Sequence, residues 1–154
     1  MTTRRRHAIP KWQILGRGEE QPNVFGDGEV YMTLYPLLRT PWFALILRRI
    51  DLPDTTGILH THGFDFWSLI LRGGYVEMRE RGPVRKYKRG SINKIKANEG
   101  HRIMRLERTP TWTLALNAKW RGFKMPELVH KDGSRTGVWE YYSMSRGASA
   151  RPNG

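Results

Sequence analysis

The sequence predicts an all-β fold, an antiparallel barrel or sandwich of short strands. Short apolar segments follow one another along most of the 154 residues, and turns rich in Gly, Pro and Asp separate them. No window of the sequence shows the sustained period of a long amphipathic helix. The length suits a single domain with a core of its own.

Three regions are expected along the chain. Residues 1–28 form a basic, irregular N-terminal arm, because Gly and Pro interrupt every period there. Residues 29–142 form the barrel, and residues 143–154 form a flexible C-terminal tail. Strands of the barrel are expected over residues 30–35, 42–47, 58–62, 66–71, 75–79, 84–88, 91–95, 101–106 and 111–116.

Local signals support several of these strands. Residues 42–47 are apolar throughout, which is typical of a central strand. The turn Arg81-Gly82-Pro83 separates two of the expected strands and predicts a hairpin. Residues 101–106 and 111–116 lie on either side of Thr109-Pro110, so they are expected to pair.

Composition excludes several classes of protein. Cysteine is absent, which excludes disulfides, thiolate metal ligands and a cysteine nucleophile. No apolar run approaches the length of a membrane span, so no membrane segment is expected. No apolar stretch follows the basic N-terminus, which argues against a secretory signal. A cytoplasmic location fits these features.

The net charge of +13 favours anionic partners. Residues 72–108 alone hold twelve Lys or Arg and four Glu. Such a surface attracts nucleic acid, phosphorylated ligands or an acidic protein; the alternative is that the charge only keeps the protein in solution and gives weak, non-specific binding to nucleic acid. In the expected strand 84–88, Tyr87 lies among cations and could stack on a base. The alternative is that Lys and Arg there protect an edge strand from aggregation.

Three of the five histidines are candidate metal ligands. His60 and His62 are two residues apart, so on a strand both imidazoles point to the same face. His101 follows about 40 residues later on another expected strand and can complete the site. Imidazole ligands suit zinc, iron, copper and nickel.

This region resembles the cupin superfamily of small β-barrels. The first cupin motif matches through His60, His62 and Gly73-Gly74, and the second matches in spacing from Gly90 through His101. The resemblance covers about residues 42–117 and implies a single cupin-type double-stranded β-helix, a jelly-roll barrel. Residues 60–77 also look like a group of small cupin-like proteins of bacteria and their phages; a phage-encoded chain would lie in the host cytoplasm.

The chain departs from the cupin pattern at the expected glutamate ligand, which would fall at Phe66 or Trp67. Asp65 is a candidate replacement. Simple alternation points Asp65 away from His60 and His62, whereas a bulge at Gly63 would turn it toward them, and both readings stay open. Without Asp65 the site would have three histidines, as in some thiol dioxygenases of the superfamily.

Two further departures fall in the second motif. Lys96 and Asn98 stand where proline and glycine are expected, and Arg105 stands where asparagine is common. By alternation Arg105 shares the face of His101, so it either meets an anionic substrate or pairs with Glu77. Glu77 is a candidate general acid or base; the alternative is a solvated residue of the hairpin.

The leading hypothesis is a metal-dependent cupin enzyme acting on a small anionic substrate. The expected cofactor is a divalent transition metal, with Fe(II) favoured for an oxygenase and Zn, Mn or Ni as alternatives. The alternative is a non-catalytic binding or structural module, such as a phage protein, whose basic surface contacts nucleic acid or an acidic protein. The resemblance also implies a homodimer, since many cupins pair through edge strands.

Overall fold

The structure, a computed structural model, describes residues 13–22, 29–54, 57–118 and 127–137. The regular elements in this part of the chain are all strands, which confirms the all-β prediction. The strands are β1 (Gln13–Ile14), β2 (Glu19–Pro22), β3 (Val30–Arg39), β4 (Phe43–Ile50), β5 (Leu59–His60), β6 (Phe66–Arg72), β7 (Gly74–Arg79), β8 (Arg85–Lys88), β9 (Ile92–Ile95), β10 (His101–Leu106), β11 (Thr111–Ala118), β12 (Glu127–Val129) and β13 (Arg135–Gly137). The described residues include no helix that could cross a membrane.

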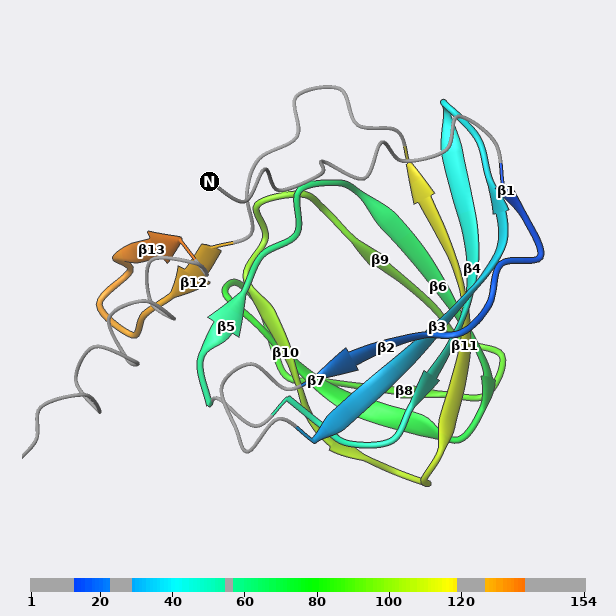
Figure 1. Cartoon of the computed structure of the whole chain (residues 1–154). Coiled ribbons are helices and arrows are strands. Elements are labelled where there is room, and N and C mark those ends of the chain that lie inside the picture. Colours follow the sequence, from blue (N-terminus) through cyan, green and yellow to red (C-terminus); the bar gives the residue numbers. More distant parts are fainter. Residues whose placement is uncertain (1–12, 23–28, 55–56, 119–126, 138–154) are drawn as a thin grey trace, which may run out of the picture.

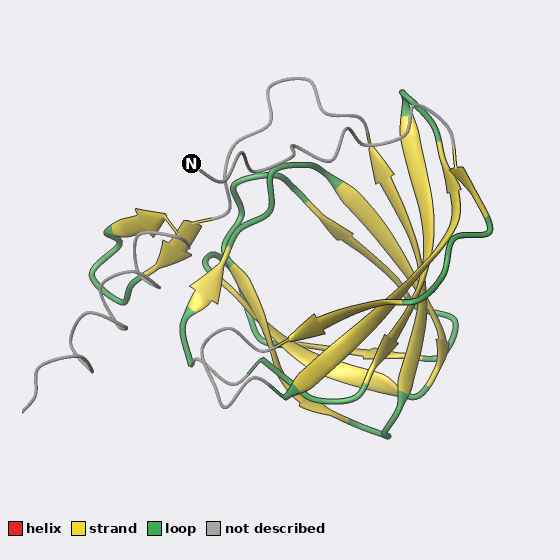
Figure 2. Ribbon diagram, viewed as in Figure 1, coloured by secondary structure: helices red, strands yellow, loops and turns green. Residues whose placement is uncertain are grey.

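Two antiparallel sheets enclose a common interior (Figures 1 and 2). One sheet has the strand order β1-β3-β4-β11-β6-β9, with β2 also paired to β3. The other has the order β13-β12-β5-β10-β7-β8. Strands distant in sequence are neighbours in both sheets, as in β4-β11-β6 and β5-β10-β7, and this crossing-over is typical of a jelly roll.

Alternation along the strands determines which side chains enter the barrel. On β6 the residues Phe66, Ser68 and Ile70 are at most 3% exposed, whereas their neighbours are more accessible. β11 pairs with β6 over most of its length and contributes small inward residues, among them the fully buried Thr113 and Ala115. Small residues on a central strand leave space in the barrel, and the candidate site uses this space.

The nine strands predicted from the sequence are all present, with most ends displaced by a few residues. The pairing expected between residues 101–106 and 111–116 is wrong, because β10 and β11 lie in different sheets. The prediction of an irregular arm over residues 1–28 is wrong for β1 and β2, which pair with β3. Arg39 on β3 explains this pairing, because its guanidinium contacts both carboxylate oxygens of Glu19 at 2.8 Å and also Gln13 at 3.0 Å. Residues 1–12, 23–28 and 138–154, including the predicted tail, lie outside the described residues.

The β12–β13 hairpin was not predicted. It joins the second sheet through β5, where Leu128 is the register partner of His60. Its turn contains Asp132-Gly133, with Gly133 at a φ of 82° and the Ser134 amide donating to Asp132 Oδ1 at 2.9 Å. An Asp-Gly pair between short apolar segments is a hairpin signal that sequence reasoning could have used.

Tyr87 on β8 does not face solvent among the cations. It is 9% exposed, and its ring lies 5.5 Å from that of Tyr75 in the interior. The adjacent cations Lys86 and Lys88 point to the other side of the strand, and Arg85 is exposed. Burial therefore removes the ring of Tyr87 from solvent, and the base-stacking role considered for it is wrong.

Candidate metal centre

Three histidines come together at one end of the second sheet. His60 ends β5, His62 lies two residues further along the chain, and His101 begins β10. Antiparallel pairing places His60 directly opposite His101. One ring nitrogen from each histidine lies within 4.8 Å of the others, and the Nε2 atoms of His62 and His101 are 2.7 Å apart. The spacing read from the sequence thus corresponds to a single cluster in space.

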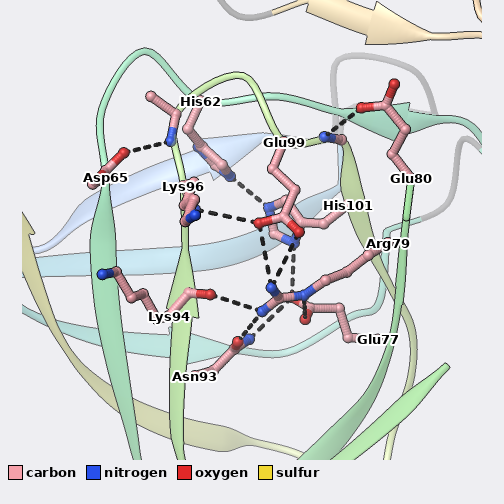
Figure 3. Close-up of polar contacts among 12 residues, drawn as sticks. His62, Asp65, Glu77, Arg79, Glu80, Asn93, Lys94, Lys96, Glu99 and His101 are labelled. Carbon is pink, nitrogen blue, oxygen red and sulfur yellow. Dashed lines mark hydrogen bonds and ion pairs between the residues drawn. The ribbon is translucent and has the colours of Figure 1, made fainter. Parts of the chain in front are cut away.

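His101 is held by Glu77, which is completely buried on β7. Nδ1 of His101 lies 2.8 Å from Oε1 of Glu77 (Figure 3). Because a carboxylate only accepts, Nδ1 carries the proton and Nε2 presents its lone pair to the other histidines. A histidine oriented by a carboxylate in this way is a common feature of metal sites.

The electrostatic environment keeps His62 and His101 neutral. Burial, followed by the charges of neighbouring groups, lowers the pKa of both His62 and His101 well below the usual 6.5. For His62 the largest of these charge effects come from His101 and His60. For His101 they come from His60 and Arg79. Neutral imidazole is the form that binds a metal ion, so no proton has to leave these two residues at neutral pH.

Glu77 belongs to a buried polar network behind the histidines (Figure 3). Its Oε2 accepts from Arg79 Nε at 2.9 Å, and its Oε1 also accepts from Asn93 Nδ2 at 3.0 Å. Arg79 reaches on to Asn93 Oδ1 and to Glu99. Burial raises the pKa of Glu77, and the hydrogen bond and charge of Arg79 partly offset this rise.

The network corrects the expectation of a solvated Glu77. The strand β7 was predicted, but the sequence did not show that the Glu77 carboxylate lies on its inward face. Arg79 and Asn93 were missed altogether, although both share an inward face with predicted site residues: Arg79 follows Glu77 by two residues on β7, and Asn93 precedes the buried Ile95 on β9. If Glu77 is taken to point inward, alternation along β7 places Arg79 on the same face, and Arg79 could have been identified in this way.

Asp65 lies outside the histidine cluster. β5 ends at His60, so the alternation argued from a continuous strand does not extend to residue 65. Its Oδ1 instead accepts from the backbone amide of Ala97 at 2.6 Å, which ties this loop to the turn before β10. The residue beside the histidines is Phe66, whose ring meets His62 edge to face with the centroids 4.9 Å apart.

The predicted inward position of Arg105 is wrong. The pairing of β10 with β7 shifts between Ile103 and Arg105, so alternation from His101 fails beyond that point. The Arg105 side chain is 68% exposed and pairs with Glu107 at 3.2 Å. The ion pair with Glu77 considered from the sequence is made by Arg79 instead.

A cavity of about 60 Å³ adjoins the histidines. Its walls include all three histidines, Phe66 and Ile103. Since a water molecule requires about 10–15 Å³ by this measure, the cavity suits only a few waters or a compact ligand. Three imidazole donors beside such a space fit a divalent transition metal with coordination positions left for a ligand.

Comparison with known proteins identifies the fold. No protein-family model and no curated protein sequence matches this chain. Among solved structures, a candidate mannose-6-phosphate isomerase from Ralstonia eutropha superposes with a TM-score of 0.54 at 20% identity, over 66% of this chain and 99% of that one. A cupin-superfamily sugar phosphate isomerase from Silicibacter pomeroyi gives 0.51 at 17% identity, over 82% and 87%.

A third structure, iron(II)-bound HppE with an alternative substrate, gives a TM-score of 0.51 at 14% identity, over 69% of this chain and 58% of that one. The fold of this chain is therefore a jelly-roll barrel like that of the cupin-superfamily isomerase, as the resemblance and the strand pattern predicted. The cupin motif positions that differ here, at Phe66 and Arg105, are accommodated within that fold.

The lowered histidine pKa values predict a pH-dependent stability of the metal-free protein. Below about pH 6.5 the unfolded chain binds protons at His62 and His101 that the folded chain does not bind, so the free energy of unfolding falls as pH falls. The slope approaches about 1.4 kcal/mol per pH unit for each histidine. Urea unfolding at several pH values measures it, and a His62→Gln variant should show a shallower slope. Equal slopes would contradict the assignment.

Proposed function

We propose that this protein is a metal-dependent cupin enzyme, an iron(II) oxygenase that acts on a small anionic substrate. The observation that carries the proposal is the convergence of three imidazoles, with His101 oriented by buried Glu77, on a small cavity. His60, His62 and His101 would hold the metal. Iron(II) with nitrogen ligands and open coordination positions supplies dioxygen chemistry.

Several properties of the site support a catalytic metal over a purely structural one, and an oxygenase is the reaction that we propose. The cavity adjoins the histidines on one side, so the ligand shell is not closed by protein groups there. Phe66 and Ile95, both 2% exposed, line the same cavity and exclude bulk water. The fold is shared with iron(II)-bound HppE, and also with sugar phosphate isomerases, which makes isomerisation with zinc or manganese the competing reaction.

The buried polar residues behind the histidines would position the metal ligand His101. Glu77 keeps the Nδ1 proton of His101 in place and, with Arg79 and Asn93 as partners, is held as an acceptor. Because Glu77 already accepts from His101, Arg79 and Asn93, we assign it to positioning His101 and not to proton transfer with the substrate. The catalytic role considered for Glu77 from the sequence thus becomes a supporting one in this proposal.

Oxygen consumption tests the proposal. The untagged protein is loaded with iron(II) under argon and then mixed with oxygenated buffer and a panel of small carboxylic acids and thiols. Uptake of oxygen that depends on one substrate and on iron, and that falls at least about 100-fold in His101→Ala, is expected. Turnover with zinc or manganese but none with iron would replace the oxygenase by a hydrolase or isomerase.

A further inference from the structure

Arg48 is a cation inside the barrel whose charge is not neutralised by the described residues. It lies on β4 between Ile46 and Ile50, which are both 5% exposed, and so it occupies the inward face. Its Nε is buried and has no hydrogen-bond partner in the described part of the chain. Its guanidinium hydrogen-bonds to a neutral group, Asn117 Oδ1, which accepts from Nη2 at 3.1 Å.

Burial lowers the pKa of Arg48 to about 10, which leaves the guanidinium charged at neutral pH. Among the described ranges, Arg48 forms no ion pair with a carboxylate, whereas Arg39, Arg79 and Arg135 each do. A buried charge without a counter-ion is costly. An arrangement of this kind is expected where an external anion supplies the missing charge.

Arg48 adjoins the candidate metal centre. Its guanidinium carbon lies 4.5 Å from the centre of the Phe66 ring, and the same ring contacts His62. Arg48, Phe66 and the three histidines line one cavity. The positive charge of Arg48 contributes to lowering the pKa of His62 and of His101, so its field reaches both imidazoles.

Thr113 supplies a second unpartnered group in the same wall. It is the register partner of Arg48 on the neighbouring strand β11, and it is completely buried. Its Oγ1 is also without a hydrogen-bond partner in the described chain, and Thr113 lines the cavity. A guanidinium N–H and a hydroxyl on adjacent strands can both donate to one anion.

The acids that line this cavity are already engaged. Asp54 accepts from the Ile103 amide at 2.5 Å through Oδ2, and Glu77 is held by His101, Arg79 and Asn93. Neither is bonded to Arg48. The cavity therefore combines the cation of Arg48, the unpartnered hydroxyl of Thr113 and three imidazoles with two carboxylates that already accept hydrogen bonds from other groups.

We propose that Arg48 and Thr113 form a carboxylate-binding subsite that orients a small organic acid toward His60, His62 and His101. As a statement about substrate class, this rests on the proposed metal-dependent function. The guanidinium fork pairs with carboxylate or phosphate, and the one unpaired cation of this cavity matches the single charge of a carboxylate better than the double charge of a phosphate dianion. The cavity of about 60 Å³ likewise favours a compact acid.

Binding of acetate, with acetamide as the neutral isostere, tests the subsite without any turnover. The Nε–H signal of Arg48 is identified in a nitrogen–proton correlation spectrum as the signal absent from Arg48→Met, or from Arg48→Lys if the first variant does not fold. Acetate is expected to shift this signal saturably, and acetamide is not. Arg48→Met should lower acetate affinity at least about tenfold, and Thr113→Val a few-fold, because a hydrogen bond to a charged group is lost.

The titration is made on zinc-loaded and on metal-free protein, so that the two proposals can fail separately. Equal acetate affinity in wild type and Arg48→Met, an immobile Arg48 signal, or equal binding of acetamide would overturn the subsite. Tighter binding of inorganic phosphate than of acetate would overturn the choice of a carboxylate. Acetate binding that requires Arg48 in a protein unable to hold metal would sustain the subsite and reject the metal-dependent enzyme.

Discussion

Replacing His60 and His62 by alanine together is expected to abolish metal binding while leaving the barrel folded. Both imidazoles lie at the edge of the cavity and are only partly buried, so their loss removes donors and little packing. Loss of a residue that only hydrogen-bonds to a metal ligand lowers metal affinity about 10–100-fold. The loss of two ligands should lower it further than this range. Elemental mass spectrometry of untagged protein, after anaerobic reconstitution, measures the bound metal per chain.

A matched control is available within the chain. His130 lies at the β12–β13 hairpin, where its Nε2 is 3.0 Å from Thr136 Oγ1, and it is not part of the histidine cluster. His130→Ala should therefore bind metal as the wild type does. Wild-type metal content in the double variant, with unchanged circular dichroism in both proteins, would contradict the assignment of the three histidines as ligands.

Sequence periodicity predicted most of the fold because the strands are short, amphipathic and separated by strong turn signals. It predicted the histidine cluster because β-pairing brings His101 opposite His60, and His62 lies only two residues beyond the end of β5. The predictions that failed depended on extending alternation further. Arg105 lies beyond a register shift in β10, and Asp65 lies beyond the end of β5.

Polar residues of the interior were missed because their strands gave them no distinctive pattern. Arg48 follows an apolar segment and stands next to Arg49, so a single sequence does not show which of the two is inward. In the structure Arg49 pairs with Asp51 while Arg48 stacks on Phe66. Only the pairing of β4 with β11 fixes this choice, because it sets the face of every residue along both strands.

The second large effect is expected from Glu77→Ala. This change removes the acceptor of His101 Nδ1 and leaves the Arg79 guanidinium, which is 11% exposed, without its closest carboxylate. Breaking a buried ion pair from one side costs about 3–5 kcal/mol of unfolding free energy, because the remaining charge stays desolvated. Metal affinity should fall as well, by about 10–100-fold, because His101 loses its orientation and the proton on Nδ1 is no longer fixed.

Urea unfolding and metal titration together distinguish these two effects from a general loss of structure. Glu77→Gln keeps an oxygen that can accept from His101 but has no charge for Arg79, so it should lose stability and retain more metal affinity than Glu77→Ala. Glu107→Gln is the matched control, since Glu107 pairs with Lys86 at the surface and its removal should change the stability little. If Glu77→Ala were as stable as Glu107→Gln, the network behind His101 would contribute little, and Glu77 would have to be explained by direct contact with a ligand in the cavity that it lines.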